Sequence, residues 1–330
     1  MRDSVFHKRL QTTHLMLPPL TGYTDYPYRV ILSDFHPPFL MTEMINAQAL
    51  VKNNKRTLHM IQKTPGTHLH GVQLLGKDPK IMADAAHVLQ DQGFDYIDIN
   101  MGCTVKKVTS RGEGVALMAH EQQAYAVVRT VTNTVDLPVT VKLRLGITKN
   151  NITIHSLAQK LEDAGAAAIT IHARSGEKKF ATTPDYTSIN NVVEKVSIPV
   201  IANGGIFTGA DAEYVLKYTR ACAVMPGRGL IGNPWIIPEI LNAIEQKPYR
   251  PPTFQDKKKI CLWHLQELCD YYGERRGVLH MRKILPKYFS SIANLKNLKQ
   301  DVLRAETEPD IVFLLEHIRC DGSSIVYINK

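Results

Sequence analysis

The sequence predicts an α/β protein: a (β/α)8 barrel of the TIM type, followed by a small all-helical domain. Over the first 240 of 330 residues, short apolar runs alternate with stretches of helical periodicity, and eight such units can be recognised. This alternation implies parallel strands joined by crossover helices, and eight units in about 230 residues match the length of such a barrel. The alternative is a doubly wound sheet, which usually has fewer strands.

Each predicted strand is a short apolar segment. In chain order the strands are Leu15–Leu20, Phe39–Glu43, His68–Leu74, Tyr96–Asn100, Val139–Leu143, Ala168–His172, Val200–Asn203 and Ala223–Met225. Helical spacing is clear between Pro79 and Gln92, where apolar side chains recur at steps of three and four residues. Several strands end on a polar residue or a glycine, and in a barrel these ends meet on the face that carries the active site.

A linker and a helical domain are expected after the barrel. Residues 247–252 read Lys-Pro-Tyr-Arg-Pro-Pro, which cannot continue a helix. We therefore divide the chain into a barrel at 1–240, a linker at 241–253 and a helical domain at 254–330, which shows helical spacing without strand-like segments. Residues 241–330 contain 15 Lys and Arg against 11 Asp and Glu, so this part is the more basic per residue.

Composition limits the class of protein. The formal net charge is +9, which favours a polyanionic partner, because clustered Lys and Arg bind phosphates. No apolar run is long enough to cross a bilayer, and the charged N-terminus lacks a secretory h-region. The five cysteines are scattered without a CxxC pair, which fits neither a disulfide framework nor a structural zinc site. We expect a cytoplasmic protein without structural metal or membrane attachment. The sequence does not decide the oligomeric state, and we expect a monomer.

Two glycine turns indicate a phosphate site. Asn203-Gly204-Gly205 follows the seventh predicted strand, and Gly227-Arg228 follows the eighth. Glycine lets the backbone approach a ligand closely and point N–H groups toward it, while Arg228 adds a positive charge. Barrels frequently bind phosphate at the loops after these two strands, so we expect a phosphate-bearing cofactor here.

Three further residues have both a functional and a structural explanation. Lys142 lies within an apolar run; inside a barrel mouth it requires an anionic or electron-rich partner, and otherwise it is a solvated surface lysine. His172 ends a strand and is either a site residue or a buried, hydrogen-bonded histidine. Cys103 stands in a glycine-containing loop after the fourth strand, where it is either an exposed acid or base or a small buried hydrophobic residue.

At these residues the sequence resembles the tRNA-dihydrouridine synthases, most closely the bacterial DusB branch. The matching segments are PPLTGYTD (18–25), TEM (42–44), VQLLG (72–76), DINMGCTVKKV (98–108), PVTVKLRLG (138–146), ITIHARS (169–175), IPVIANGGI (198–206) and GRGLIGNPW (227–235). They span most of the first 240 residues in the order that the family has. HMRKILPKY (280–288) is similar to the family's helical C-terminal domain.

The resemblance implies an FMN enzyme that reduces the C5–C6 bond of uridine in tRNA with NADPH, or NADH, as reductant. Hydride would pass from FMN N5 to C6, and Cys103 would give a proton to C5. FMN would be held by Pro19, Leu20, Thr21, Gln73, Lys142, His172, Asn203, Gly204, Gly205, Gly227 and Arg228. The substrate uridine would be lined by Glu43, Asn100 and Arg174. For tRNA phosphates we expect Lys106, Lys107, Arg275, Arg276, Arg282, Lys283 and Lys287 as contacts.

Three positions depart from the family pattern. Thr104 follows Cys103 where proline is usual, which removes a fixed φ from that loop. Gly176 stands where an arginine is common, and Leu20 replaces a usual methionine. Two other functions are weighed against the synthase: an FMN barrel that acts on a small molecule, and an inactive RNA-binding paralogue. The basic helical domain argues against the first, and the retained flavin ligands argue against the second.

Overall fold

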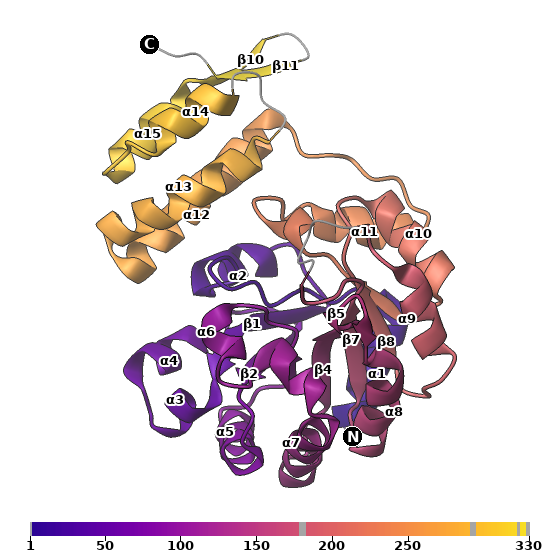
Figure 1. Ribbon diagram of the computed structural model, residues 1–330. Helices are drawn as coiled ribbons and strands as arrows, with labels where there is room; N and C mark the ends of the chain where they lie inside the picture. The colour runs from indigo at the N-terminus through magenta and orange to yellow at the C-terminus, as the bar shows by residue number, and fades with distance from the viewer. Residues whose placement is uncertain (1, 178–182, 291–294, 322–323, 328–330) are drawn as a thin grey trace.

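The computed structural model describes residues 2–177, 183–290, 295–321 and 324–327, and its centre is a curled sheet of seven parallel strands (Figure 1). The strands, in their order across the sheet, are β1 (Phe39–Asn46), β2 (Leu69–Leu75), β3 (Tyr96–Met101), β4 (Val139–Arg144), β7 (Ala168–His172), β8 (Val200–Asn203) and β9 (Ala223–Met225). All seven coincide with predicted strands. The sheet order follows the chain order, as in a (β/α)8 barrel and unlike a doubly wound sheet.

The first predicted strand, Leu15–Leu20, is shorter than expected but closes the barrel. Met16 N donates to Val224 O at 3.0 Å, and Val224 N donates to His14 O at 2.9 Å, so the segment pairs with β9. On its other side Leu17 N donates to Phe39 O at 3.4 Å, which joins it to β1. Pairing stops at Leu17 because the next two residues are prolines, which have no N–H to donate. Residues 18–20 are therefore a loop, and the predicted barrel is confirmed with this correction.

Helices surround the sheet (Figure 1). They are α2 (Tyr26–Ser33), α3 (Ala47–Val51), α4 (Lys55–Met60), α5 (Pro79–Asp91), α6 (Lys106–Thr109), α7 (Glu121–Thr134), α8 (Ile154–Asp163), α9 (Tyr186–Val193), α10 (Gly209–Thr219) and α11 (Ile236–Ile244), with 3₁₀ helices η1 (Gly114–Ala119) and η2 (Arg228–Leu230). A hairpin of β5 (Gly146–Thr148) and β6 (Asn151–Ile152) follows β4. In the described part of the chain, no helix is both long and apolar enough to span a membrane.

An N-terminal helix that the sequence analysis did not anticipate, α1 (Arg2–Thr13), closes the lower end of the barrel. Its Phe6 and Leu10 are completely buried and pack with Phe39 and Tyr96 in an aromatic cluster, with ring centroids 5.2–5.8 Å apart. These side chains fill the barrel interior at the amino ends of the strands. The cavity that carries the predicted site residues lies at the opposite, carboxyl end.

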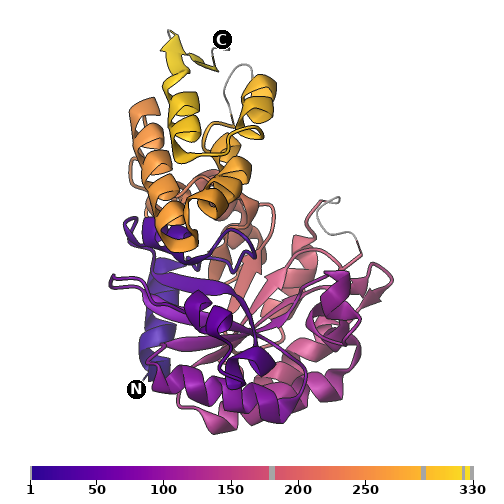
Figure 2. The same cartoon turned by 90° about the vertical axis from the view of Figure 1, so that its left-hand side faces the viewer.

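The C-terminal part is mainly helical and stands over the open end of the barrel, beside α2 (Figures 1 and 2). It contains α12 (Phe254–Tyr272), α13 (Glu274–Tyr288), α14 (Leu295–Val302) and α15 (Glu308–Glu316), followed by β10 (Ile318–Asp321) and β11 (Ser324–Tyr327). The predicted helical C-terminal region is confirmed, and the antiparallel hairpin at its end was not predicted. The missed signal in the sequence is the Gly-Ser dipeptide at 322–323 between two short strand-forming runs, a pattern that favours a two-residue hairpin turn.

Buried aromatic contacts join the helical part to the barrel. Tyr28 of α2 stacks on His264 of α12 with ring centroids 4.8 Å apart. The hydroxyl of Tyr28 donates to Leu230 O, in the loop after β9. His264 Nδ1 in turn lies 3.0 Å from the hydroxyl of Tyr288 on α13. All three rings are buried, so the interface is packed like a domain core rather than a hinge.

Gly277→Ala tests the packing of α12 against α13. A Cβ at this position would lie 2.7 Å from the backbone N and Cα of Cys269, so the helices must move apart. We expect a loss of about 1–3 kcal/mol in stability, as for other overpacked sites, seen as a lower midpoint of thermal unfolding. The control is Leu279→Ala, which trims a side chain that is 47% exposed on the same helix. Equal midpoints for the two variants would contradict the close contact.

Candidate functional site

A small cavity opens at the carboxyl ends of the barrel strands. Its volume is about 140 Å³, and it is lined by Pro18, Pro19, Leu20, Lys142, Arg144, His172, Arg174, Asn203, Gly204, Gly205, Phe207, Gly227 and Arg228. Nine of the predicted cofactor residues are among them, together with Arg174 from the predicted substrate set. The volume is below the roughly 300–1,000 Å³ of typical ligand sites, so it suits one end of a nucleotide rather than the whole molecule.

Positive charge is concentrated in this cavity. Four of its lining residues are Lys or Arg, and the lining residues that the structure describes include no aspartate or glutamate. Burial, followed by Arg144, lowers the pKa of Lys142, and burial together with the surrounding cations lowers the pKa of His172. Crowded cations of this kind favour an anionic ligand, because a bound anion relieves their mutual repulsion.

The backbone around the cavity is shaped by glycine. Gly204 and Gly205 have φ of 112° and 79°, in the region that side chains rarely adopt. A Cβ on Gly204 would lie 2.7 Å from the His172 ring. Asn203 connects this turn to the strands, because its Oδ1 accepts from Lys142 Nζ at 3.0 Å and its Nδ2 donates to Met225 O at 2.7 Å. The predicted turn and the predicted lysine therefore belong to one hydrogen-bonded unit.

Cys103 lies half-buried in the loop after β3, and side-chain and backbone bonds hold it on both sides. The Asn100 carboxamide oxygen accepts from Gly102 N at 3.2 Å and Cys103 N at 3.0 Å. Val115 N donates to Cys103 O at 3.0 Å. These bonds hold the loop although Thr104, and not proline, follows the cysteine.

A buried chain of hydrogen bonds supports Asn100 from within the barrel. Asn100 Nδ2 donates to Gln73 Oε1 at 2.7 Å, and Gln73 Nε2 donates to Asp98 Oδ2 at 2.6 Å. Thr140 donates to the other carboxylate oxygen of Asp98 at 2.6 Å. Burial raises the pKa of Asp98. Gln73, predicted to bind cofactor, is thus engaged with Asp98 and Asn100 and does not line the cavity.

Arg144 is a site residue that the sequence analysis missed. It lines the cavity, and its guanidinium donates to Gly102 O at 2.9 Å and to Ser175 O at 3.1 Å. Burial, followed by Arg174, lowers the pKa of Arg144 to about 10, and Cys103 acts in the opposite direction. Arg144 therefore links the cationic cavity to the cysteine loop. Its signal in the sequence is its spacing of two from Lys142, which places both side chains on the same face of a strand.

Two predicted residues lie beside the helical part instead of in the cavity. Glu43 stands at an irregularity of the β1–β2 pairing, and its carboxylate accepts from Gly22 N. Burial raises the pKa of Glu43, while the Gly22 N–H and the nearby Arg29 lower it. Thr21 is exposed next to this contact. The structure places Glu43 as a support of the loop that carries Pro19 and Leu20.

The predicted RNA-binding cations occupy three places. Lys106 and Lys107 are exposed on α6, directly after the cysteine loop. Four cations are exposed along α13, namely Arg275, Arg276, Lys283 and Lys287. Arg282 is turned into the helical part, where its Nε donates to Ala305 O at 2.8 Å.

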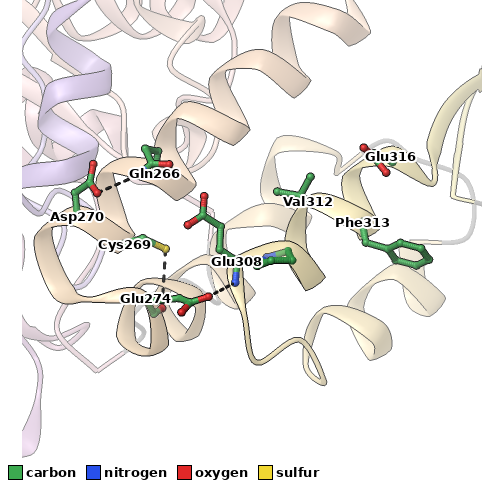
Figure 3. A pocket seen from close by; sticks show the side chains of 9 residues that line it. Gln266, Cys269, Asp270, Glu274, Glu308, Val312, Phe313 and Glu316 are labelled. Atoms are coloured by element: carbon green, nitrogen blue, oxygen red, sulfur yellow. Dashed lines mark hydrogen bonds between the residues drawn. The ribbon is translucent and has the colours of Figure 1, made fainter.

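A second hollow, of about 630 Å³, lies in the helical part between α12 and α15 (Figure 3). Its lining includes four carboxylates, those of Asp270, Glu274, Glu308 and Glu316. This charge repels phosphate groups, whereas α13 carries the exposed cations Lys283 and Lys287. Among the residues that the structure describes, no group of three or more His, Cys, Asp or Glu side chains is placed to hold a metal ion.

The fold and the cavity together define a barrel enzyme with an anion-binding mouth next to a cysteine loop. The family described as dihydrouridine synthase (Dus) matches residues 16–318, which is most of the chain. The chain therefore belongs to the dihydrouridine synthase family, and the predicted resemblance is confirmed.

The alignments with two relatives cover most of both chains, and the names of these relatives state one activity. The chain is 38% identical over 282 residues to tRNA-dihydrouridine synthase B of Escherichia coli K12, which covers 84% of this chain and 87% of that protein. It is 36% identical over 279 residues to a probable tRNA-dihydrouridine synthase of Rhizobium leguminosarum, covering 84% and 86%. Among solved structures, TcOYE with pHBA is similar with a TM-score of 0.50 and 13% identity, covering 74% of this chain and 92% of that one, which supports the fold alone.

The affinity of the cavity for an anion should fall as the pH rises from about 7 to about 10. Lys142 attracts the anion only while it is protonated, and its lowered pKa means that deprotonation starts well below the usual 10.5. Sulfate is the suitable probe for calorimetry, since its own charge is constant over this range. Lys142→Met should bind sulfate more weakly and with a flatter pH profile. A profile as steep as that of the wild type would exclude Lys142 as its cause.

Proposed function

We propose that the protein is a flavin-dependent tRNA-dihydrouridine synthase, which reduces the C5–C6 bond of uridine in tRNA with NADPH as reductant. The observation that carries this function is the cationic cavity joined through Arg144 to the Cys103 loop, in a chain of the dihydrouridine synthase family. The substrate and the reaction follow those that the relatives' names state, and we place the work of this protein in the cytoplasm, where tRNA is processed.

The residues present fit an FMN cofactor. The turns at Gly204–Gly205 and Gly227 with Arg228 suit a phosphate group, because they combine close backbone approach with fixed charge. Lys142 suits the electron-rich edge of a flavin ring, and a bound flavin compensates the cost of burying this cation. When bound, FMN supplies the hydride that uracil C6 accepts.

Cys103 supplies the proton in this mechanism. The thiol protonates C5 of the uracil as negative charge develops there, and the resulting thiolate regains its proton from solvent. Asn100 and Val115 hold the cysteine backbone, so the thiol is aimed without help from a proline. Arg144, whose charge interacts with Cys103, stabilises the thiolate that remains after the transfer.

Exposed cations around the mouth position the RNA. Lys106 and Lys107 lie beside the cysteine loop, and Lys283 and Lys287 lie where α13 meets the barrel. Phosphate contacts of this kind fix the register of an RNA without reading its sequence. The uridine must leave its stack to enter the mouth, at a cost of a few kcal/mol, which is least for a loop nucleotide.

The decisive experiment is a map of dihydrouridine in cellular tRNA and rRNA, with and without this gene. Loss at defined tRNA positions upon deletion supports the proposed function and identifies the substrate uridine. Purified protein that reduces a small molecule but no uridine would favour the alternative flavin barrel, and protein that binds tRNA without flavin would favour an inactive paralogue.

Cys103→Ala should still bind FMN and oxidise NADPH. Its rate of dihydrouridine formation should fall by about 100-fold or more, because a general acid typically accelerates a reaction by such a factor. The readouts are the flavin absorbance spectrum and nucleoside analysis of the tRNA product. Cys222→Ala is the matched control, because this other half-buried cysteine lies at the start of β9, away from the mouth. Wild-type activity in Cys103→Ala would reject the proton-donor role.

Arg276→Glu should weaken tRNA binding and reduce the salt dependence of that binding by about one phosphate contact. The flavin spectrum should not change, since this side chain is exposed on α13. Lys217→Glu, an equal charge reversal at an exposed position of α10 on the barrel wall, is the control. If both variants lower tRNA affinity equally, only the net charge matters and α13 is not a specific RNA surface.

A further inference from the structure

The loop that leads from the closing strand to α2, residues 18–25 and hereafter the mouth loop, forms one wall of the cavity. It supplies Pro18, Pro19 and Leu20 to the lining. Internally it is held by a turn in which Thr24 N donates to Leu20 O at 2.9 Å and Leu20 N donates to Thr24 Oγ1 at 2.8 Å. A turn of five residues cannot fix its own orientation, so contacts at its far end set how the wall faces the cavity.

Asp25 anchors that far end. It is almost completely buried, and its Oδ1 accepts from Tyr28 N at 3.2 Å, which caps α2. Burial, followed by the neighbouring Glu43, raises the pKa of Asp25 to about 6. A buried carboxylate oxygen without a hydrogen-bond donor destabilises the folded protein. The second oxygen of Asp25, Oδ2, therefore also requires a donor.

The donor for this second oxygen comes from the helical part. Tyr272, the last residue of α12, donates its hydroxyl to Asp25 Oδ2 at 3.0 Å, and its ring stacks on His280 of α13 at 4.3 Å. Nearby, Lys283 Nζ donates to Gly22 O at 3.2 Å and lies 5.6 Å from the centre of the Tyr23 ring. The mouth loop is thus fastened by side chains that lie about 250 residues later in the chain.

The other wall of the cavity is braced from the same side. Gly232, in the loop after β9, packs so closely on α13 that a Cβ there would lie 2.7 Å from Lys287 Cβ and 2.8 Å from Tyr288 N. Leu230 O, in the same loop, receives the buried Tyr28 hydroxyl. The helical part therefore contacts both loops that flank the cavity while it presents its basic side to RNA.

We infer that Tyr272 is a positioning residue: its hydroxyl holds the mouth loop in the shape that binds the cofactor, so that the helical part completes the flavin site as well as receiving tRNA. The inference rests on the proposed function for the identity of the cofactor. It gives the helical part a second task that a purely RNA-binding appendage would not have.

Tyr272→Phe removes one oxygen atom and keeps the ring stacked on His280, so the chain should fold. Apoprotein of the full chain is titrated with FMN, and binding is followed by quenching of flavin fluorescence. We expect the affinity for FMN to fall by about tenfold, because the loss of one hydrogen bond to a charged acceptor changes an equilibrium constant by about that factor. The rate of flavin reoxidation at saturating tRNA should fall with it, while the affinity for tRNA stays unchanged.

Tyr271→Phe is the matched control. This neighbouring tyrosine also crosses the interface, because its hydroxyl donates to His59 O at 2.8 Å and its ring stacks on His59 and Tyr26. In the part of the chain that the structure describes, its hydroxyl bonds to His59 and not to the mouth loop, so removing that hydroxyl should affect thermal stability alone. Tyr271→Phe therefore reports the general effect of weakening the interface by one hydroxyl.

Three results would overturn the inference: equal FMN affinity in Tyr272→Phe and wild type, equal losses of FMN affinity in both tyrosine variants, or a change confined to tRNA affinity. The proposed function fails separately. A wild-type protein that binds FMN but reduces no uridine contradicts the synthase activity, while the FMN titrations still decide the role of Tyr272.

Discussion

The repulsion among the cations crowded at the mouth of the barrel is the constraint on which the site depends. Lys142 and Arg144 come from β4, Arg174 follows β7 and Arg228 follows β9, and all four line one cavity of about 140 Å³. Hydrogen bonds to Asn203, Gly102 and Ser175 hold two of these cations in place, so they cannot simply turn away from each other. Without a bound anion, the repulsion among these cations lowers the stability of the protein. Binding of an anionic cofactor offsets that loss.

The parts of the fold that repeat were predictable from the sequence, and the parts that occur once were not. Seven strands show the apolar run and the polar end of a parallel barrel, and their register places Lys142 and Asn203 together. The plug formed by Phe6 and Leu10 has no such signature, because α1 is short and charged and, among its side chains whose burial the structure describes, only these two are buried. The hairpin of β10 and β11 was missed because its strands are shorter than any reliable alternation pattern.

The candidate site likewise contains residues that a local sequence pattern predicts and residues whose contacts only the structure reveals. The glycine turns, Lys142 and Cys103 each stand in a recognisable local pattern, whereas Glu43 and Gln73 were placed by motif alone. The structure gives these two a supporting position, since Glu43 binds Gly22 N and Gln73 joins Asp98 to Asn100. Partners of this kind are tens of residues apart in the chain, and only the closed barrel brings them into contact.

The departures from the family pattern are absorbed by neighbouring backbone. A proline at position 104 would restrict the backbone of the cysteine loop. In its place, the hydrogen bonds of Cys103 with Asn100 and Val115 hold that loop. Gly176 N donates to Gly146 O at 2.9 Å, and a Cβ there would lie 3.0 Å from Ile147 O, so the absence of a side chain lets the β5–β6 hairpin dock. Neither Thr104 nor Gly176 lines the cationic cavity. Under the proposed function, these two positions therefore concern the entry of the uridine rather than the binding of the cofactor.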